Sequence, residues 1–182
     1  LNGSGTAEKV DGGYKISGRK FFSSGSSGGD LIVTTGVYDD PQVGPTVLHF
    51  SISLKGEGVT IVEDWDTMGM RGTGSNSVIL KEVFVPEDSI SLSRPSGKWM
   101  TFFDVISPIA WSLVMSAYLG VAETAREIAI AEAKKKKDDQ IVQEIVGEMD
   151  TNLLCAQTAL ECLVGLVGPE FTPSTENSNL TY

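Results

Sequence analysis

The residues best suited to chemistry gather between Phe21 and Asp30, where a strand-like pattern gives way to serine and glycine. Phe22 offers a flat apolar face, Ser23 and Ser24 offer hydroxyl groups, and the glycines that follow allow a flexible backbone. A flat ring with polar atoms along one edge needs this combination, because its faces favour apolar contact and its edge favours hydrogen-bond donors. A strand that simply ends in a serine-glycine loop has the same composition, so this stretch alone leaves both interpretations open.

A second stretch, Met68 to Ser75, contains three glycines, two hydroxyl side chains and one arginine in eight residues. Arg71 supplies the cation, and Thr73 and Ser75 supply the hydroxyls. Backbone amides and a cation arranged in this way can surround an anion or the polar edge of a ring. The pattern is not a nucleotide-binding fingerprint, because a strand follows it rather than a helix. The alternative is a bulged turn in which Arg71 faces solvent or pairs with a neighbouring aspartate.

Short β-strands must position both stretches. Five apolar runs, bounded by glycine, aspartate, proline or serine, have the length and alternation of strands, and five to seven strands are expected in this half. The runs are Tyr14–Lys20, Leu31–Tyr38, Thr46–Leu54, Val59–Val62 and Val78–Val85. Because no helical stretch separates them, they predict an antiparallel barrel or sandwich rather than a parallel sheet.

Helical periodicity replaces the strand pattern after a linker at Pro95 to Gly97. Ser107 followed by Pro108 predicts a helix start, since a hydroxyl can cap and proline is tolerated at the first helical position. This helix is expected to end at the lysine run Lys134–Lys137, whose charges suit the carboxyl end of a helix dipole. The residues after it predict a second long helix.

The second helix is expected to open at Asp138 and Asp139 and to end at Gly168-Pro169. Its apolar residues recur at alternating steps of four and three, which is a heptad stripe. The stripe consists of Val142, Val146, Met149, Leu153, Ala156, Leu160, Leu163 and Val167. Two long helices joined by a short turn should pack as an antiparallel hairpin.

Bulk composition restricts the function classes. With 24 acidic against 14 basic residues in 182, the net charge of −10 disfavours nucleic acids and anionic membranes as partners. We identify no apolar run of membrane-spanning length. Cys155 and Cys162 would lie roughly 10 Å apart on one helix face, too far for a disulfide, so we expect buried free thiols in the cytoplasm. His49 is the sole histidine and is expected to be an ordinary strand residue, so no metal site is predicted.

Both chemical stretches resemble the middle β-domain of the acyl-CoA dehydrogenase superfamily, and the likeness covers about residues 3 to 168. That family has the pattern Gly-x-Tyr-x-Ile-x-Gly-x-Lys-x-Trp-Ile-Thr, and then Trp-Asp-x-Met-Gly-x-Arg-Gly-Thr-x-Ser followed by Val-Phe-Val-Pro. The matching residues here are Gly13, Tyr14, Ile16, Gly18, Lys20, Phe22, Ser23 and Ser24, and then the segment Trp65–Pro86.

The resemblance implies an α+β fold: an antiparallel β-barrel-like domain followed by a long antiparallel helical hairpin, which is part of a four-helix bundle. The implied domains are a flavin-contacting middle β-domain at 1–95, a partial carboxyl-terminal helical domain at 96–169 and a polar tail at 170–182.

The resemblance also implies a bound flavin, FAD or alternatively FMN. The implied flavin-binding residues are Phe22, Ser23, Ser24, Arg71, Thr73 and Ser75; no catalytic residue is assigned, and none of Glu144, Glu148 and Glu161 is taken as a base. The implied activity is oxidation of the CH–CH group of an acyl thioester, by hydride transfer to flavin N5, in a homo-oligomer (dimer or tetramer) that binds acyl-CoA or another small molecule. The alternatives are a monooxygenase of the same fold that uses reduced flavin and O2, and a non-catalytic fragment that serves assembly.

Overall fold

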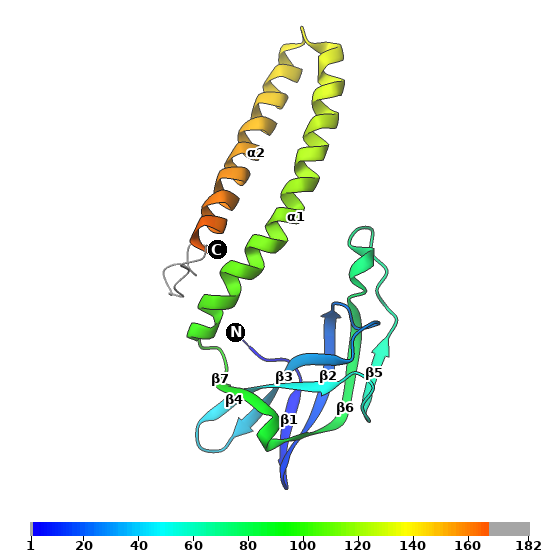
Figure 1. The fold of residues 1–182 in the computed structure, drawn as a ribbon, viewed down its shortest axis with the longest axis vertical. Helices are drawn as coiled ribbons and strands as arrows, with labels where there is room; N and C mark the ends of the chain where they lie inside the picture. The colour runs from blue at the N-terminus through cyan, green and yellow to red at the C-terminus, as the bar shows by residue number, and fades with distance from the viewer. Residues whose placement is uncertain (1, 168–182) are drawn as a thin grey trace. The chain divides into compact units, whose positions relative to one another are not determined.

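The chain has an α+β fold in a computed structural model that describes residues 2–167 (Figure 1). It divides into two compact units, with the division between Lys98 and Trp99. The first unit consists of β-strands and the second of helices, which confirms the predicted α+β class. The predicted helix end at Gly168-Pro169 and the predicted polar tail at 170–182 lie outside the described residues.

One seven-stranded sheet makes up the first unit, in the order β5-β6-β2-β1-β3-β4-β7. The strands are β1 Thr6–Val10, β2 Gly13–Ser23, β3 Leu31–Asp40, β4 Gly44–Ser53, β5 Val59–Val62, β6 Asn76–Pro86 and β7 Ile90–Pro95, with short 3-10 helices η1 Arg71–Thr73 and η2 Glu87–Ser89. All pairings are antiparallel except the short parallel contact of β1 with β3. Among the described strands β5 and β7 end the sheet without pairing to each other, so closure into a barrel is not seen.

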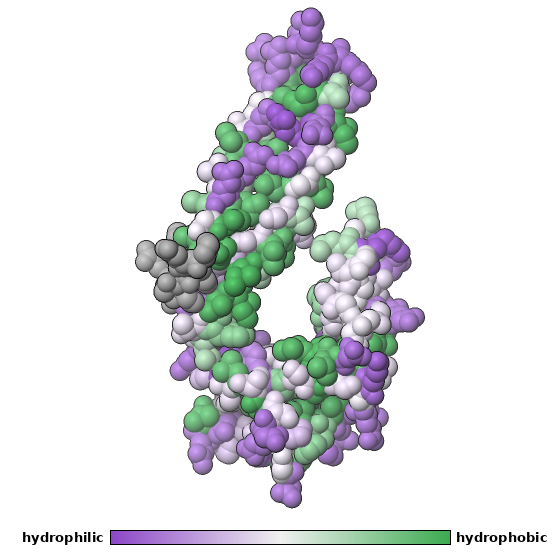
Figure 2. Space-filling view, viewed as in Figure 1, coloured by the Kyte–Doolittle hydropathy of each residue, from purple (hydrophilic) through white to green (hydrophobic). Residues whose placement is uncertain are grey.

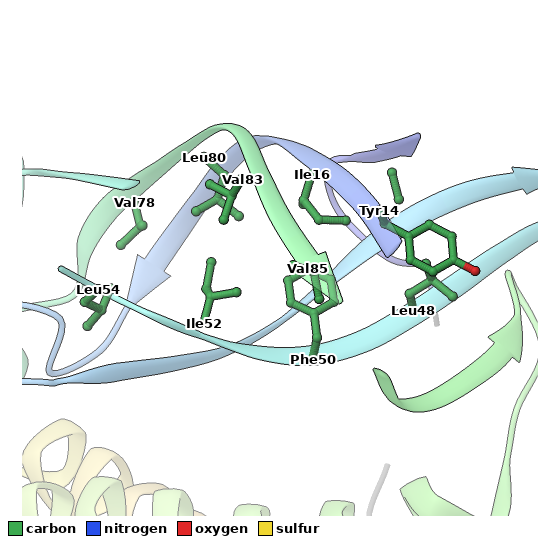
Figure 3. Packing of buried hydrophobic residues seen from close by; sticks show 11 residues of the cluster. Tyr14, Ile16, Leu48, Phe50, Ile52, Leu54, Val78, Leu80, Val83 and Val85 are labelled. Carbon is green, nitrogen blue, oxygen red and sulfur yellow. The ribbon is translucent and has the colours of Figure 1, made fainter. Parts of the chain in front are cut away.

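A single apolar core holds the sheet together. Alternate residues of β2, β4 and β6 face inward, and Ile16, Phe50 and Val78 are completely buried. Figure 3 shows side chains of β2 and β6 pointing toward those of β4, so the sheet curves and its two halves cover one another. Tyr14 and Tyr38 pack edge to face with ring centroids 5.5 Å apart. This core fixes β2 and β6, the two strands that carry the chemical stretches.

The first long helix, α1, spans Thr101–Ala133 and begins before the predicted start at Ser107-Pro108, so that prediction was wrong. Pro108 lies inside the helix, where proline removes a backbone hydrogen bond and costs about 3 kcal/mol in isolation. The first turn is held by a 2.7 Å hydrogen bond that Trp99 Nε1 donates to Asp104 Oδ1. A carboxylate at this position also suits the helix dipole.

The second long helix, α2, spans Gln140–Leu166 after the 3-10 helix η3 (Lys134–Lys136). Its start confirms the prediction, because the Asp139 carboxylate caps the helix by accepting from the amides of Ile141 and Val142. The two helices contact each other. Arg126 of α1 forms a bidentate ion pair with Asp150 of α2, with Nε 2.6 Å from Oδ1 and Nη2 3.1 Å from Oδ2. In the heptad stripe all members except Ala156 are partly buried.

Two further expectations about this unit were wrong. Thr101–Lys136 is long and apolar enough to cross a membrane by length and composition, because an 18-residue window within it has a mean hydropathy of 1.7. Core helices of other proteins have the same character, and only 17% of this window is buried here. Apolar side chains gather along the first half of α1 (Figure 2). Cys155 and Cys162 are free but exposed rather than buried, because α2 is covered on one face only.

Candidate functional site

The two candidate stretches, Phe21–Asp30 and Met68–Ser75, lie side by side because β2 and β6 pair antiparallel. Ser23 at the end of β2 stands opposite Asn76 at the start of β6, so the loop after β2 lies next to the loop before β6. The amide of Gly25 donates to the carbonyl of Thr73 at 2.8 Å and joins the two loops directly. Strand pairing and this loop contact thus bring together two stretches that lie about fifty residues apart in the sequence.

Phe22 stands out of this edge of the sheet in a strained conformation. A bulge between Lys20 and Ser23 interrupts the pairing of β2, and Phe22 within it has φ of 56°, a left-handed conformation uncommon for an aromatic residue. The bulge leaves 73% of the Phe22 surface exposed. Its ring meets the edge of Trp65 at a centroid distance of 6.1 Å, and Trp65 is itself held by a 3.1 Å bond from Nε1 to the carbonyl of Met70. The protein therefore holds a large apolar surface in solvent on a braced backbone.

A chain of three hydroxyl groups lies beside Phe22. Ser24 Oγ is 2.9 Å from Ser75 Oγ, and Ser75 Oγ is 2.7 Å from Thr73 Oγ1. Thr73 Oγ1 in turn donates to the carbonyl of Met70 at 2.9 Å. Ser75 is only 6% exposed, whereas Ser24 is exposed at the end of the chain. Three of the predicted site residues are thus connected by direct hydrogen bonds.

A hollow of about 480 Å³ opens at this point, within the size range of small-molecule sites. Phe22, Ser23 and Ser24 line it, together with exposed apolar residues of β3 such as Leu31 and Val33. Thr73 and Ser75 do not line the hollow themselves and reach it only through Ser24. The hollow therefore combines apolar walls with a hydroxyl-bearing edge.

Lys20 lies at the base of the hollow and was not among the predicted site residues. Its side chain is buried, and Nζ donates to the carbonyls of Ser4 and Thr35 and lies 3.0 Å from Ser4 Oγ. Burial lowers the pKa of Lys20 from 10.5 to about 8. The signal for its position was in the sequence, because Tyr14, Ile16 and Lys20 share the inward face of one strand.

Arg71 occupies a different environment from the other predicted site residues. Its guanidinium pairs with Asp66 at 2.7 Å and donates to the carbonyl of Thr67 at 2.8 Å, and both charged side chains are exposed. This arrangement matches the ion-pair alternative given above, and Arg71 does not line the hollow. It braces the loop that carries the hydroxyl chain.

Asp64 fastens the same loop to the sheet. Its carboxylate accepts from the amide of Ser77 at 2.8 Å and from Arg19 at 2.7 Å. The hydrogen bonds from Ser77, aided by Arg19, lower the pKa of Asp64 from 3.8 to about 2. The carboxylate is thus a charged structural anchor at neutral pH.

The remaining polar candidates are structural. His49 lies on β4 and accepts a 3.0 Å hydrogen bond from Arg94 Nε, and burial with the Arg94 charge lowers the pKa of His49. Within residues 2–167 no group of three histidine, cysteine or acidic side chains is placed to hold a metal ion. The hollow beside Phe22 is the candidate site, because the predicted residues Phe22, Ser23 and Ser24 line it.

Comparison with known proteins identifies the family to which this chain belongs. No protein-family model matches the chain. It is 34% identical over 163 residues to a protein of Bacillus subtilis (strain 168) named "Putative acyl-CoA dehydrogenase YdbM", covering 83% of this chain and 40% of that protein. It is 36% identical over 126 residues to dibenzothiophene monooxygenase of Rhodococcus erythropolis, covering 65% of this chain and 30% of that enzyme. The chain belongs to the acyl-CoA dehydrogenase superfamily.

A solved structure agrees with this membership. FMN-bound TdsC from Paenibacillus sp. A11-2 superposes with a TM-score of 0.69 and 26% identity, covering all of this chain and 51% of TdsC. The matched regions thus cover between 30% and 51% of these three proteins. The resemblance drawn from the two sequence stretches is confirmed at the level of the superfamily.

Proposed function

We propose that this chain carries the ring-binding part of a flavin site in a flavin-dependent oxidoreductase. The observation that supports the proposal is the exposed, braced ring of Phe22 beside the hydroxyl chain that ends at Ser24. A flavin ring is flat and apolar on its faces and polar along one edge, so the residues present fit it. Phe22 would contact the ring, Ser23 and Ser24 would face its polar edge, and Thr73 and Ser75 would hold Ser24 in place.

The flavin would supply acceptance of a hydride or, when reduced, reaction with O2. The residues of this chain would bind and orient it and exclude water from one face of the ring. We propose FMN or FAD as the flavin, and FMN is supported by its presence in the TdsC structure. Arg71 is proposed to act by bracing the site loop, because its guanidinium is already engaged by Asp66 and Thr67.

Between the two reactions of the superfamily, monooxygenation has the better support. Dibenzothiophene monooxygenase is 36% identical to the chain over the compared region. Lys20 is the sole titratable side chain among the described residues that line the hollow, so a base for the dehydrogenase reaction would have to come from another part of the protein. Dehydrogenation of an acyl thioester is the second candidate, favoured by the 34% identity with YdbM over 83% of the chain.

We also propose the finer features of the architecture. The curved sheet would form a barrel-like domain, and α1 and α2 would form an antiparallel hairpin within a larger helical bundle. Exposed apolar side chains on α1, which include Leu113 and Val121, are suited to packing against further helices or another copy in a dimer or tetramer. A cytoplasmic location stays a prediction.

Flavin titration tests the proposed site. The full-length protein is titrated with FMN and FAD, and binding is followed by visible absorbance and flavin fluorescence. We expect Phe22→Ala to weaken binding about threefold to tenfold, because one aromatic contact contributes roughly 0.5 to 1.5 kcal/mol. Phe84→Ala is the matched control, since Phe84 is also an exposed phenylalanine of this unit but does not line the hollow. Absence of flavin binding by the unaltered protein would favour an assembly role, and equal binding by both variants would place the flavin elsewhere.

A second assay separates the two reactions. The flavin-loaded protein is mixed with an acyl-CoA without oxygen, and the flavin absorbance is followed. In parallel, reduced FMN, O2 and dibenzothiophene are supplied, and products are examined by mass spectrometry for added oxygen. We expect oxygen-bearing product in the second arm; bleaching with acyl-CoA and no oxygenated product would establish dehydrogenation instead.

A further inference from the structure

The protons of the hydroxyl chain can be assigned by counting donors. Each of Ser24, Ser75 and Thr73 has one hydroxyl proton, and the chain ends at the carbonyl of Met70, which can only accept. When Thr73 donates to Met70, its contact with Ser75 at 2.7 Å requires Ser75 to donate to Thr73. The 2.9 Å contact of Ser24 with Ser75 then requires Ser24 to donate inward. Ser24 in this state presents only lone pairs to the hollow.

Hydrogen-bond donation along the three hydroxyl groups can also run in the opposite direction, at a small cost in free energy. If Thr73 donates to Ser75 and Ser75 donates to Ser24, the Ser24 proton is free to point into the hollow. The carbonyl of Met70 stays bonded in that state, because Trp65 Nε1 at 3.1 Å and the amide of Thr73 at 3.2 Å also donate to it. The two directions therefore differ by one hydroxyl-to-carbonyl hydrogen bond, which is worth about 0.5 to 1.5 kcal/mol.

We propose that Ser24, Ser75 and Thr73 form a reversible hydroxyl chain that sets the redox preference of the site, with Ser24 as a hydrogen-bond acceptor in the favoured direction. The proposal rests on the proposed flavin function. A reduced flavin carries a proton on the ring nitrogen that is bare in the oxidised form, so an acceptor at Ser24 favours the reduced form. Ser75 and Thr73 are positioning residues in this scheme, because neither lines the hollow: Ser75 contacts Ser24, and Thr73 acts through Ser75.

Burial of Ser75 couples the three hydroxyl groups, so that they all point in one direction or all in the other. Ser75 is almost inaccessible to solvent, so water is not placed to supply an alternative partner and its proton must go to Thr73 or to Ser24. A change at Thr73 is therefore transmitted to Ser24 across the buried hydroxyl. The loop that carries Thr73 is itself held by the Arg71 to Asp66 ion pair.

The test compares the affinities of oxidised FMN and of dithionite-reduced FMN in the full-length protein without oxygen. We expect Ser75→Ala to lower the preference for reduced FMN about threefold to tenfold, because Ser24 then rotates freely. Thr73→Val should lower it at least as much, since the Ser75 proton then has Ser24 as its remaining hydroxyl partner. A tenfold change corresponds to a fall of about 30 mV in the two-electron midpoint potential of bound FMN, which is the second readout.

Two controls separate this role from a structural one. A structural defect weakens both redox forms equally and leaves their ratio unchanged. Thr46→Val removes a buried hydroxyl that donates to the carbonyl of Gly44 at 2.9 Å outside the hollow, and it should leave the ratio unchanged. In a Ser24→Ala background, Ser75→Ala should have no further effect on the ratio.

The outcomes distinguish this inference from the proposed function. If the unaltered protein binds FMN and both Ser75→Ala and Thr73→Val keep the original ratio, the hydroxyl chain is refuted while the flavin site stands. If the unaltered protein binds neither form, both proposals fail. Should Ser75→Ala unfold, as judged by circular dichroism, Thr73→Val decides, because Thr73 is partly exposed and valine has nearly its shape.

Discussion

Replacement of Lys20 by methionine probes the base of the hollow, where an ammonium group is buried against two carbonyls. Burial lowers the pKa of Lys20 from 10.5 to about 8, so between these pH values the folded protein binds fewer protons on this group than the unfolded chain. Stability must therefore rise as pH rises through this window. With 1.36 kcal/mol for each pKa unit, the rise is about 3 kcal/mol.

The assay is urea unfolding of the full-length protein and of Lys20→Met between about pH 7.5 and 10.5. We expect the free energy of unfolding of the unaltered protein to gain about 3 kcal/mol relative to Lys20→Met across this range. Other groups titrate here too, so Lys81→Met, which removes an exposed lysine of β6, serves as the matched control and should follow the unaltered protein. Parallel curves for the unaltered protein and Lys20→Met would refute the reasoning, because burial would then not disfavour the charged form.

Other perturbations test the packing and the anchors. Leu153→Asp on the half-buried stripe of α2 should lower the melting temperature far more than Leu154→Asp, because the Leu153 side chain is partly buried whereas that of Leu154 is 62% exposed. Asp139→Ala should cost about 1 kcal/mol in urea unfolding, since it removes the cap of α2; no change would mean that the cap is replaced by water. Asp64→Asn should lower the melting temperature at pH 7, and the difference should shrink as pH falls from about 4 toward 2, because the pKa of Asp64 is lowered mainly by hydrogen bonds from Ser77. A difference independent of pH would contradict that origin.

Local sequence patterns were sufficient to predict most of the strands and to identify the superfamily. Alternation and turn residues located β2 to β6, and the capping carboxylate Asp139 located the start of α2. The pattern failed where two signals competed. Pro108 looked like a first helical residue, but the helix begins at Thr101, where Trp99 is bonded to Asp104 of the first turn, and the proline lies inside the helix. The short strand β1 carries charged residues in place of a clear apolar alternation, and β7 alternates over four residues only; their pairing partners define both strands.

The candidate site was predictable in its residue types and not in its connections. Glycine and hydroxyl patterns indicated Phe22, Ser24 and Thr73, yet no local rule gives the register that sets Ser23 opposite Asn76. The left-handed conformation of Phe22 follows from a bulge in that pairing, so it could not be read from neighbouring residues. Hydrogen bonds within the hydroxyl chain depend on rotamers fixed by both loops together. Strand pairing and loop contacts in the folded structure, rather than local secondary-structure propensity, therefore bring the site residues together.

The most direct test of the central claim is a crystal structure of the full-length protein with bound FMN. The account predicts electron density for the flavin ring in the hollow, in contact with Phe22 and with the Ser24 hydroxyl within hydrogen-bonding distance of the polar edge of the ring. Density for the ring at the opposite end of β6 near Phe84, with the hollow beside Phe22 free of flavin, would contradict it.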